Sequence, residues 1–291
     1  MNPGARRLGH VLLAVLFLGA IGGTCLAGGL LDLEPEGPIA AKERTLLLAT
    51  FVLMLLVLVP VIAMTIGFAW HYRASNQAAE YKPDWESSLG IELAIWLIPG
   101  AIVGVLAWLT WVYTHRLDPY KPVDPGVAAL EVQVVALDWK WLFIYPTLNI
   151  ASVNQLAMPV DKPVSFAITS DTVMNSFFIP QLGGQVYAMA GMRTELHLVA
   201  DKPGNFFGEN TQYSGRGFPF QHFDVLAMKD HDFDAWVEKA RLAPMTLDAS
   251  RFRGLEQPSI RHPVTLYRAV ESGLFTRIID KYSSAMMPPA H

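Results

Sequence analysis

Three apolar runs stand out in the N-terminal third of the chain, and their lengths separate them. Residues 8–21 form a short run that follows two arginines and ends in small residues, which is typical of a secretory signal. Residues 45–70 carry no charged side chain, and residues 89–113 carry one, Glu92. At about 1.5 Å per residue, each of these two runs can cross a hydrocarbon core of about 30 Å as a helix. The pattern predicts a signal in residues 1–24 and two transmembrane helices.

The direction of the two helices follows from the signal. If the signal exports the mature N-terminus, residues 25–44 are an exported segment, the first helix runs inward, and residues 71–88 form a cytoplasmic loop. The second helix then returns the chain outward, so everything after Arg116 is exported. Tryptophan, tyrosine and basic side chains gather at the end of the second run, where interfacial anchors are expected.

After the second apolar run the pattern changes to short β-rich stretches separated by turn residues. Between residues 128 and 228 these stretches recur at 131–145, 164–169, 186–189, 194–199 and 223–228. Frequent Gly, Pro and Asp residues between them are typical of an antiparallel sandwich or barrel. Residues 229–291 instead show the apolar spacing of amphipathic helices, which predicts a small helical C-terminal tail.

An aromatic stretch opens the β-rich region, where residues 138–146 read DWKWLFIYP. Trp139 and Trp141 are two positions apart, so on a strand both would point to the same face. We expect them to form a rigid aromatic surface or part of a sandwich core.

The composition agrees with a membrane protein that carries an exported domain. The chain is 52% hydrophobic and only 16% charged. Its eight histidines form neither an HExxH motif nor a Cys/His cluster, and no phosphate loop or dinucleotide fingerprint occurs. The net charge of −4 and the scattered basic residues argue against a nucleic-acid partner.

Four stretches, in order along the chain, carry a family resemblance: GFAWHYRASN (67–76), residues 138–146, VMNSFFIPQLGGQVYAMAGM (173–192) and YSGRGF (213–218). They resemble subunit II of the cytochrome bo-type ubiquinol oxidases, a branch of the haem-copper terminal oxidases. The resemblance covers the chain from the signal to about Met228. It implies a membrane-anchored all-β fold, in which a two-helix transmembrane hairpin precedes a cupredoxin-like β-sandwich or barrel and a small helical tail.

The resemblance also bears on metal binding. In cytochrome c oxidases, subunit II holds a dinuclear copper centre through two cysteine thiolates, two histidines, a methionine and a backbone carbonyl. In this chain, the side-chain ligand positions are occupied by Asn175, Tyr213, Gly217, Gln221 and Asp224. Copper of this kind needs soft thiolate ligands, and the single cysteine, Cys25, lies elsewhere. We therefore predict that this chain binds no metal and no cofactor.

His222 lies one residue from the position of the second histidine ligand. On a strand this offset turns it to the opposite face, so we expect a surface or loop histidine. Without copper in this chain, a quinol dissolved in the lipid can deliver electrons to haem within the membrane. The resemblance implies that the haem groups and copper of the reaction are in a partner, subunit I.

Cys25 directly follows the signal-like run and cannot form an internal disulfide in a chain with one cysteine. Its position suggests a bacterial lipoprotein, cleaved before Cys25 and acylated on it, as in many relatives in the quinol oxidase branch. Gly22, Gly23 and Thr24 depart from the usual residues before such a cysteine. The alternative is a chance cysteine in a signal that is uncleaved or cleaved elsewhere.

Glu92 stands near the start of the second long apolar run. An acid in the first turn of a helix is stabilised by the helix dipole by about 0.3–1 kcal/mol, which would explain this residue without a function. Ionisable groups at membrane depth also tend to mark ion paths. In the resembling oxidases, a glutamate at the matching place lies at the cytoplasmic mouth of a proton pathway of subunit I. We therefore interpret Glu92 as a candidate proton-entry residue.

These observations favour subunit II of a proton-pumping ubiquinol oxidase in the bacterial inner membrane, with the C-terminal domain in the periplasm. Such a complex oxidises quinol and reduces oxygen to water, and this chain would be its copper-free scaffold without catalysis of its own. Its expected partners are subunit I, the smaller oxidase subunits, ubiquinol and membrane lipid. The alternatives are subunit II of a cytochrome c oxidase, and a stand-alone membrane-anchored cupredoxin-like module that binds a partner or senses copper.

Overall fold

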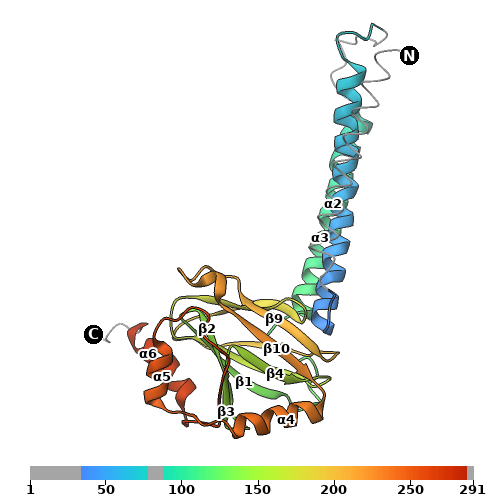
Figure 1. Ribbon diagram of the computed structural model, residues 1–291. Coiled ribbons are helices and arrows are strands. Elements are labelled where there is room, and N and C mark those ends of the chain that lie inside the picture. The colour runs from blue at the N-terminus through green and yellow to red at the C-terminus, as the bar shows by residue number, and fades with distance from the viewer. Residues whose placement is uncertain (1–33, 78–87, 287–291) are drawn as a thin grey trace, which may run out of the picture. The chain divides into compact units, whose positions relative to one another are not determined.

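The computed structural model describes residues 34–77 and 88–286, which divide into two units. One unit, Ala41–Lys121, is built from helices. The other contains the chain from Pro122 onward together with the described residues before Ala41, and it holds the strands. Figure 1 shows the elements of both units. The predicted signal, residues 1–24, lies outside the described residues.

The helical unit consists of most of α2 (Pro38–His71) together with α3 (Leu89–Arg116). Both helices are long and apolar enough to cross a membrane, and large apolar side chains are exposed all along them, for example Trp96 at 79%. A helix that is apolar on every side requires an apolar surrounding such as lipid. Pro60 and Pro99 lie inside the helices without ending them, and α2 extends beyond the predicted span at both ends.

The threonine hydroxyls inside α2 are hydrogen-bonded within the helix itself. The hydroxyls of Thr45, Thr50 and Thr65 each donate to the carbonyl four residues earlier, at 2.9, 3.0 and 2.7 Å. A threonine bonded in this way leaves no polar group unpaired, so it is compatible with a membrane span.

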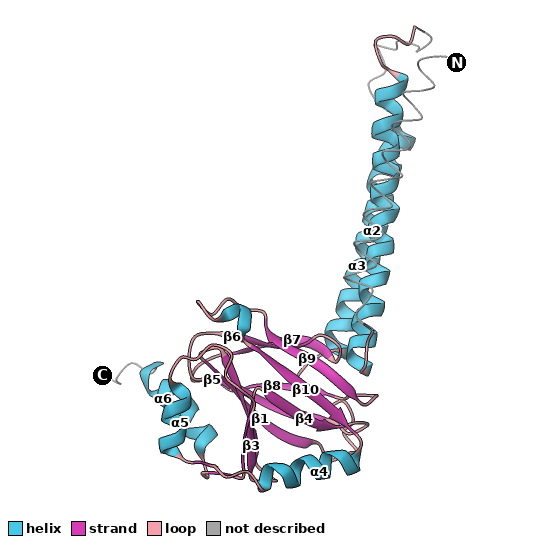
Figure 2. Ribbon diagram, in the orientation of Figure 1, coloured by secondary structure: helices cyan, strands magenta, loops and turns pink. Residues whose placement is uncertain are grey.

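Two sheets make up the β-domain (Figure 2). The six-stranded sheet has the order β12-β3-β2-β1-β5-β8, and the five-stranded sheet has the order β4-β10-β9-β6-β7. The first contains β1 (Leu130–Leu137), β2 (Lys140–Tyr145), β3 (Ile150–Val153), β5 (Val164–Ser170), β8 (Thr194–Leu198) and β12 (Thr265–Tyr267). The second contains β4 (Gln155–Pro159), β6 (Asn175–Ile179), β7 (Gly183–Ala188), β9 (Gly204–Asn210) and β10 (His222–Met228).

The strand pairing is mixed rather than purely antiparallel. β1 pairs parallel with β5, and β4 pairs parallel with β10, while the other pairs within the two large sheets are antiparallel. A parallel pair needs a long connection between its strands, and here several intervening strands supply it. The expectation of an antiparallel arrangement is therefore wrong for these two pairs, although the predicted two-sheet sandwich is present.

Strands β1 and β2 are buried on both faces, and alternation sorts their residues into two cores. In β2, Trp141, Phe143 and Tyr145 point into the core between the sheets, while Leu142 and Ile144 point into a second core on the outer face of the six-stranded sheet. β1 alternates in the same way. Burial on both sides explains why residues 134–137 and 141–145 are apolar at every position instead of alternating with polar ones.

The expectation for Trp139 is wrong. Residues 131–145 are not one strand, because Leu137 pairs directly with Lys140 and the chain turns between them. Trp139 lies in this hairpin turn with φ 62°, so it does not share a strand face with Trp141. A bulky residue in the left-handed region persists only where its surroundings hold it.

Aromatic side chains fill the core between the sheets. Phe177 and Phe223 stack with ring centroids 5.2 Å apart, and Trp141 meets both rings edge-on. The Tyr145 hydroxyl donates to the Ala157 carbonyl at 2.9 Å and accepts from the Ala157 N–H at 2.8 Å, which joins the two sheets. Burial raises the pKa of the Tyr145 phenol, so it stays protonated as this link requires.

The C-terminal segment contains helices, as predicted, but it also contributes strands. α4 (Asp230–Arg241) packs on the core between the sheets, while α5 (Ala249–Glu256) and α6 (Leu274–Met286) cover the second core (Figure 1). β11 (Thr246–Leu247) and β13 (Ala269–Val270) form a small parallel pair, and β12 extends the six-stranded sheet beside β3. Such short strands carry too little alternation to be predicted. We call residues 242–286 the arm.

Candidate functional site

The residues at the predicted copper-ligand positions gather at one end of the five-stranded sheet. Asn175 opens β6, and Gln221 directly precedes β10. Tyr213 and Gly217 lie in residues 211–221, which connect β9 to β10. Because β6, β9 and β10 are neighbours with antiparallel pairing, the start of β6, the end of β9 and the start of β10 come together.

Four side chains at this end of the sheet form a buried hydrogen-bond network. They are Asn175, Asn210, Ser214 and Gln221, and we call them the amide cluster. Asn210 Nδ2 and Gln221 Nε2 both donate to Asn175 Oδ1, at 2.8 and 3.0 Å. Asn210 Nδ2 and the Ser214 hydroxyl both donate to Gln221 Oε1, at 2.9 and 2.7 Å. The three amide residues are at most 4% exposed, so these bonds replace water that the side chains cannot reach.

The amide cluster also forms hydrogen bonds with the surrounding backbone. Asn210 Oδ1 accepts from the Ser176 N–H at 2.8 Å, Asn175 Nδ2 donates to the Val173 carbonyl at 2.7 Å, and Gln221 Nε2 reaches a β1 carbonyl at 3.3 Å. Its polar atoms are thus occupied by neutral protein groups. A metal ion would have to displace several of these bonds and would find amide and hydroxyl donors without a thiolate. The residues present do not fit a dinuclear copper centre.

The two thiolate positions of the copper proteins have different surroundings here. Tyr213 is 72% exposed and packs its ring on Phe218, with centroids 5.7 Å apart. Gly217 is buried under the indole of Trp139, and a Cβ at this position would overlap that ring. Trp139 Nε1 donates to the Ser214 carbonyl at 3.0 Å. The indole therefore covers the connection and is bonded to it, which supplies the support that the left-handed Trp139 backbone needs.

His222 and Asp224 both lie on the exposed face of β10, and Phe223 between them is buried. The His222 ring packs against Phe207, with centroids 5.4 Å apart. His222 is thus a surface histidine, as the sequence predicts. Among residues 34–77 and 88–286, no group of three or more His, Cys, Asp or Glu side chains could hold a metal ion.

Glu92 lies in the first turn of α3, and its N–H donates to the Ser88 carbonyl at 2.9 Å. Its side chain is exposed. Both interpretations of Glu92 place it at the start of a helix. A first-turn acid must lie near the positive end of the helix dipole, and a proton-entry group must be open to water. Cys25, the predicted acylation site, lies outside the described residues.

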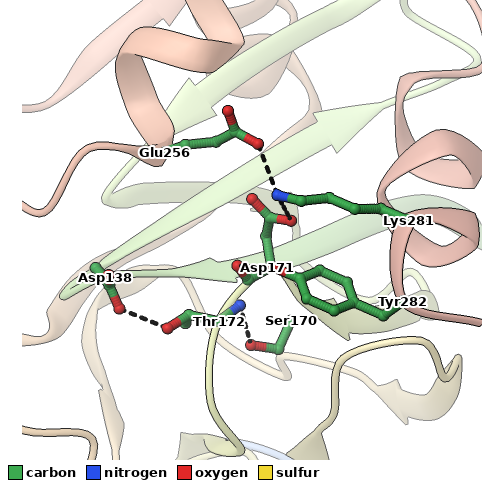
Figure 3. A network of polar contacts seen from close by, with 7 residues as sticks. All are labelled: Asp138, Ser170, Asp171, Thr172, Glu256, Lys281 and Tyr282. Atoms are coloured by element: carbon green, nitrogen blue, oxygen red, sulfur yellow. Dashed lines mark hydrogen bonds and ion pairs between the residues drawn. The ribbon is translucent and has the colours of Figure 1, made fainter. Parts of the chain in front are cut away.

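A charged cluster, which the sequence did not single out, holds α6 against the β-domain (Figure 3). Lys281 Nζ lies 2.9 Å from Asp171 Oδ1 and 2.8 Å from Glu256 Oε1, and the Tyr282 hydroxyl donates to the Asp171 carbonyl at 2.8 Å. Burial outweighs the opposing effect of Lys281 and raises the pKa of Asp171. Burial lowers the pKa of Lys281, but the hydrogen bonds to Glu256 and Asp171 outweigh this and raise it.

Lys140 is a second charged group missed in the sequence. It is 0% exposed, and burial lowers its pKa to about 8, although the Asp138 carboxylate opposes the change. The sequence signal was a lysine within an aromatic stretch that is otherwise mostly apolar. Lysine is almost never fully buried unless it is paired, so this position indicates a buried lysine with a partner elsewhere in the chain.

Comparison with known proteins identifies the family. Residues 129–225 match the family described as cytochrome c oxidase subunit II, periplasmic domain, and residues 241–286 match the COX aromatic rich motif. Cytochrome bo(3) ubiquinol oxidase subunit 2 of Pseudomonas aeruginosa is 51% identical over 249 residues, which are 86% of this chain and 75% of that protein. Ubiquinol oxidase subunit 2 of Acetobacter aceti is 50% identical over 265 residues, 90% of this chain and 86% of that protein. The chain belongs to the ubiquinol oxidase subunit II family.

Membership of the ubiquinol oxidase subunit II family confirms the predicted resemblance. It also confirms the predicted order of two apolar helices, a cupredoxin-like sandwich of the periplasmic-domain type and a short helical C-terminus. Among solved structures, the periplasmic domain of subunit II of cytochrome oxidase from Bradyrhizobium japonicum covers 38% of this chain and 93% of its own, with 25% identity and a TM-score of 0.37. The cytochrome c oxidase alternative is less specific, since relatives with half of their residues identical are named ubiquinol oxidase subunits.

Proposed function

We propose that this chain is the copper-free subunit 2 of a ubiquinol oxidase that oxidises quinol, reduces oxygen to water and pumps protons across the bacterial inner membrane. The observation that carries the proposal is the amide cluster. Two of its neutral side chains, Asn175 and Gln221, stand at positions where the copper-binding branch has ligands, and they bond to each other, to Asn210 and to Ser214. The names of the relatives from Pseudomonas aeruginosa and Acetobacter aceti support the same activity.

In this proposal the chain passes no electrons and catalyses nothing by itself. Quinol dissolved in the lipid delivers its electrons to haem in subunit I, which also holds the copper of the oxygen-reducing centre. This chain is a scaffold that α2 and α3 anchor in the membrane, with the β-domain in the periplasm. Its partners are subunit I, the smaller oxidase subunits and membrane lipid.

Purification in mild detergent tests this function. We expect haem and a polytopic subunit to purify with this chain, ubiquinol-driven oxygen consumption, and no turnover with reduced cytochrome c. Activity with cytochrome c and a near-infrared mixed-valence copper band would instead assign the chain to a cytochrome c oxidase. A colourless chain that purifies alone would indicate the stand-alone module.

We further propose that Glu92 collects protons from the cytoplasm at the mouth of a pathway in subunit I. Glu92→Gln should then give a complex with normal subunit and haem content but several-fold lower quinol oxidase activity. Glu92→Asp should retain more activity, because it keeps a carboxyl group within reach. Oxygen-electrode rates on haem-quantified complexes measure this. Normal activity in Glu92→Gln would reduce Glu92 to a first-turn residue whose loss costs about 0.3–1 kcal/mol of helix stability.

We also propose that the mature chain begins at Cys25 and carries acyl chains there. The intact mass of the purified subunit should show the loss of residues 1–24 and the addition of lipid. Replacement of Cys25 should leave the complex in the membrane, because two transmembrane helices anchor far more strongly than acyl chains do. A mass that retains the signal, or an unmodified Cys25, would contradict acylation.

A further inference from the structure

The arm contains a segment without helix or strand, residues 257–264, which runs between α5 and β12. We call it the strap. It contacts the β-domain at points that are distant in sequence. Asn154 Nδ2 donates to the His262 carbonyl at 2.7 Å, and Arg261 lies over the Phe220 ring, 4.4 Å from its centroid. The strap therefore contacts both the residue that links β3 to β4 and the connection that contains Tyr213 and Gly217.

Lys140 fixes the first part of the strap. Its ammonium donates to the Gln257 carbonyl and the Ser259 hydroxyl, both at 2.8 Å, and to the Asp138 carbonyl of its own hairpin at 3.2 Å. A fully buried ammonium is costly unless its donors are paired, and two of the three oxygens here belong to the strap. The strap and the Lys140 side chain thus stabilise each other, since loss of Lys140 removes a donor from two strap oxygens and loss of the strap removes two of the three acceptors of Lys140.

The hairpin that carries Lys140 also contacts residues 211–221 directly. Trp139 covers Gly217 and donates to the Ser214 carbonyl, while Phe220 at the far end of the connection is held by Arg261 of the strap. In a copper-binding protein, a loop that supplies thiolates is ordered by the metal it binds, because metal binding and folding are coupled. This chain must order the same connection without a metal.

We propose that the strap takes the place of a metal in ordering residues 211–221, with Lys140 as the residue that positions the strap. The amide cluster holds the connection from inside, and the strap with Trp139 holds it from outside. The proposal rests on the copper-free state given in the proposed function, and it assigns the arm a task in such a subunit.

Hydrogen–deuterium exchange on the intact purified complex tests this proposal. The reporters are the N–H groups of Phe218, Phe220 and Gln221, which bond within the connection. Lys140→Met removes the ammonium that holds the strap and should raise their exchange by about tenfold or more, as expected from the loss of charge-assisted hydrogen bonds. Arg261→Gln removes only the contact with Phe220 and should raise it severalfold.

Lys281→Met is the matched control, because it releases α6 at the charged cluster without touching the strap. It should raise exchange at the Arg277 N–H of α6 and leave the three reporters unchanged. If Lys140→Met and Arg261→Gln leave the reporters protected, the strap does not order the connection. An equal rise in Lys281→Met would show general loosening and also overturn the proposal. If Lys140→Met does not assemble, the exposed Arg261→Gln variant decides alone.

Discussion

Two groups of buried polar side chains in the β-domain are paired in different ways. In the amide cluster the side chains are neutral and bond to one another at 2.7–3.0 Å. At the arm, the buried groups are charged, with Lys140 held by strap oxygens and Asp171 held by Lys281. A closed neutral network depends on geometry and not on pH, whereas buried charges couple their contacts to protonation. We therefore expect the contacts of the amide cluster to be insensitive to pH and those of the arm to depend on it.

Opening the amide cluster should give the largest loss of stability. Asn210→Ala removes one of the two hydrogen bonds at Asn175 Oδ1 and one of the two at Gln221 Oε1, and it leaves the buried Ser176 N–H unpaired. An unpaired buried group costs about 1–3 kcal/mol and each lost hydrogen bond about 0.5–1.5 kcal/mol, so we expect the free energy of unfolding to fall by about 3 kcal/mol. Chemical denaturation of the purified chain measures it. The exposed Asn205 on the same strand is the control, and Asn205→Ala should stay within about 0.5 kcal/mol.

A second experiment separates the neutral site from the charged one by pH. Lys140 has a pKa of about 8 in the folded chain and the ordinary value of 10.5 when unfolded. Between these values the unfolded state binds more protons, so a rise from pH 8 to about 10 should stabilise the wild type relative to Lys140→Met by on the order of 2 kcal/mol.

The relevant quantity is the difference between the two proteins, because tyrosines and other lysines titrate in the same range. Asn210→Ala should run parallel to the wild type over this pH interval, since it changes no charge at the arm. A flat difference between the wild type and Lys140→Met would show that Lys140 keeps an ordinary pKa in the folded chain.

The smallest expected change in stability comes from a pair of glycine substitutions, which test how closely the Trp139 indole covers residues 211–221. Gly217→Ala places a methyl group against this ring and should cost about 1 kcal/mol or more through overpacking. Gly254→Ala in α5 meets no atom within 4 Å and should instead stabilise the chain, by up to about 1 kcal/mol, because alanine is the better helix former. Thermal denaturation of both variants compares them. Equal shifts of the same sign would mean that the indole moves away freely.

The sequence predicts the fold where a pattern is local and long. The two long apolar helices follow from runs with at most one charged residue, and α4 and α6 follow from their apolar spacing. The turn at Trp139 was missed because β1 and β2 are apolar on both faces, and only Asp138 and Lys140 interrupt the apolar residues between 134 and 145. The pairing of β1 with β5 was missed because alternation says nothing about which strands are neighbours.

The candidate site was predictable only at the ligand positions. Family resemblance pointed to Asn175 and Gln221, but their shared partner Asn210 corresponds to no ligand and appears only when β6, β9 and β10 are side by side. The same limit holds for the charged contacts. Lys140 bonds to a carbonyl 117 positions away, and Asp171 bonds to a lysine 110 positions away. Contacts between such distant segments have no local signature.

The position of β12 has a consequence for biogenesis. β3 is buried along its whole length, and its outer edge is completed only by Thr265–Tyr267, close to the end of the chain. Until these residues have passed through the translocation machinery, the six-stranded sheet has an open edge beside an uncovered apolar face, and such an edge pairs readily with other chains. The periplasmic domain therefore cannot complete this sheet before residues 265–267 have been exported. A chain that stalls or ends before residue 265 should expose an unpaired strand edge and an apolar face. Proteases and chaperones of the periplasm can recognise such a chain before the subunit joins its complex.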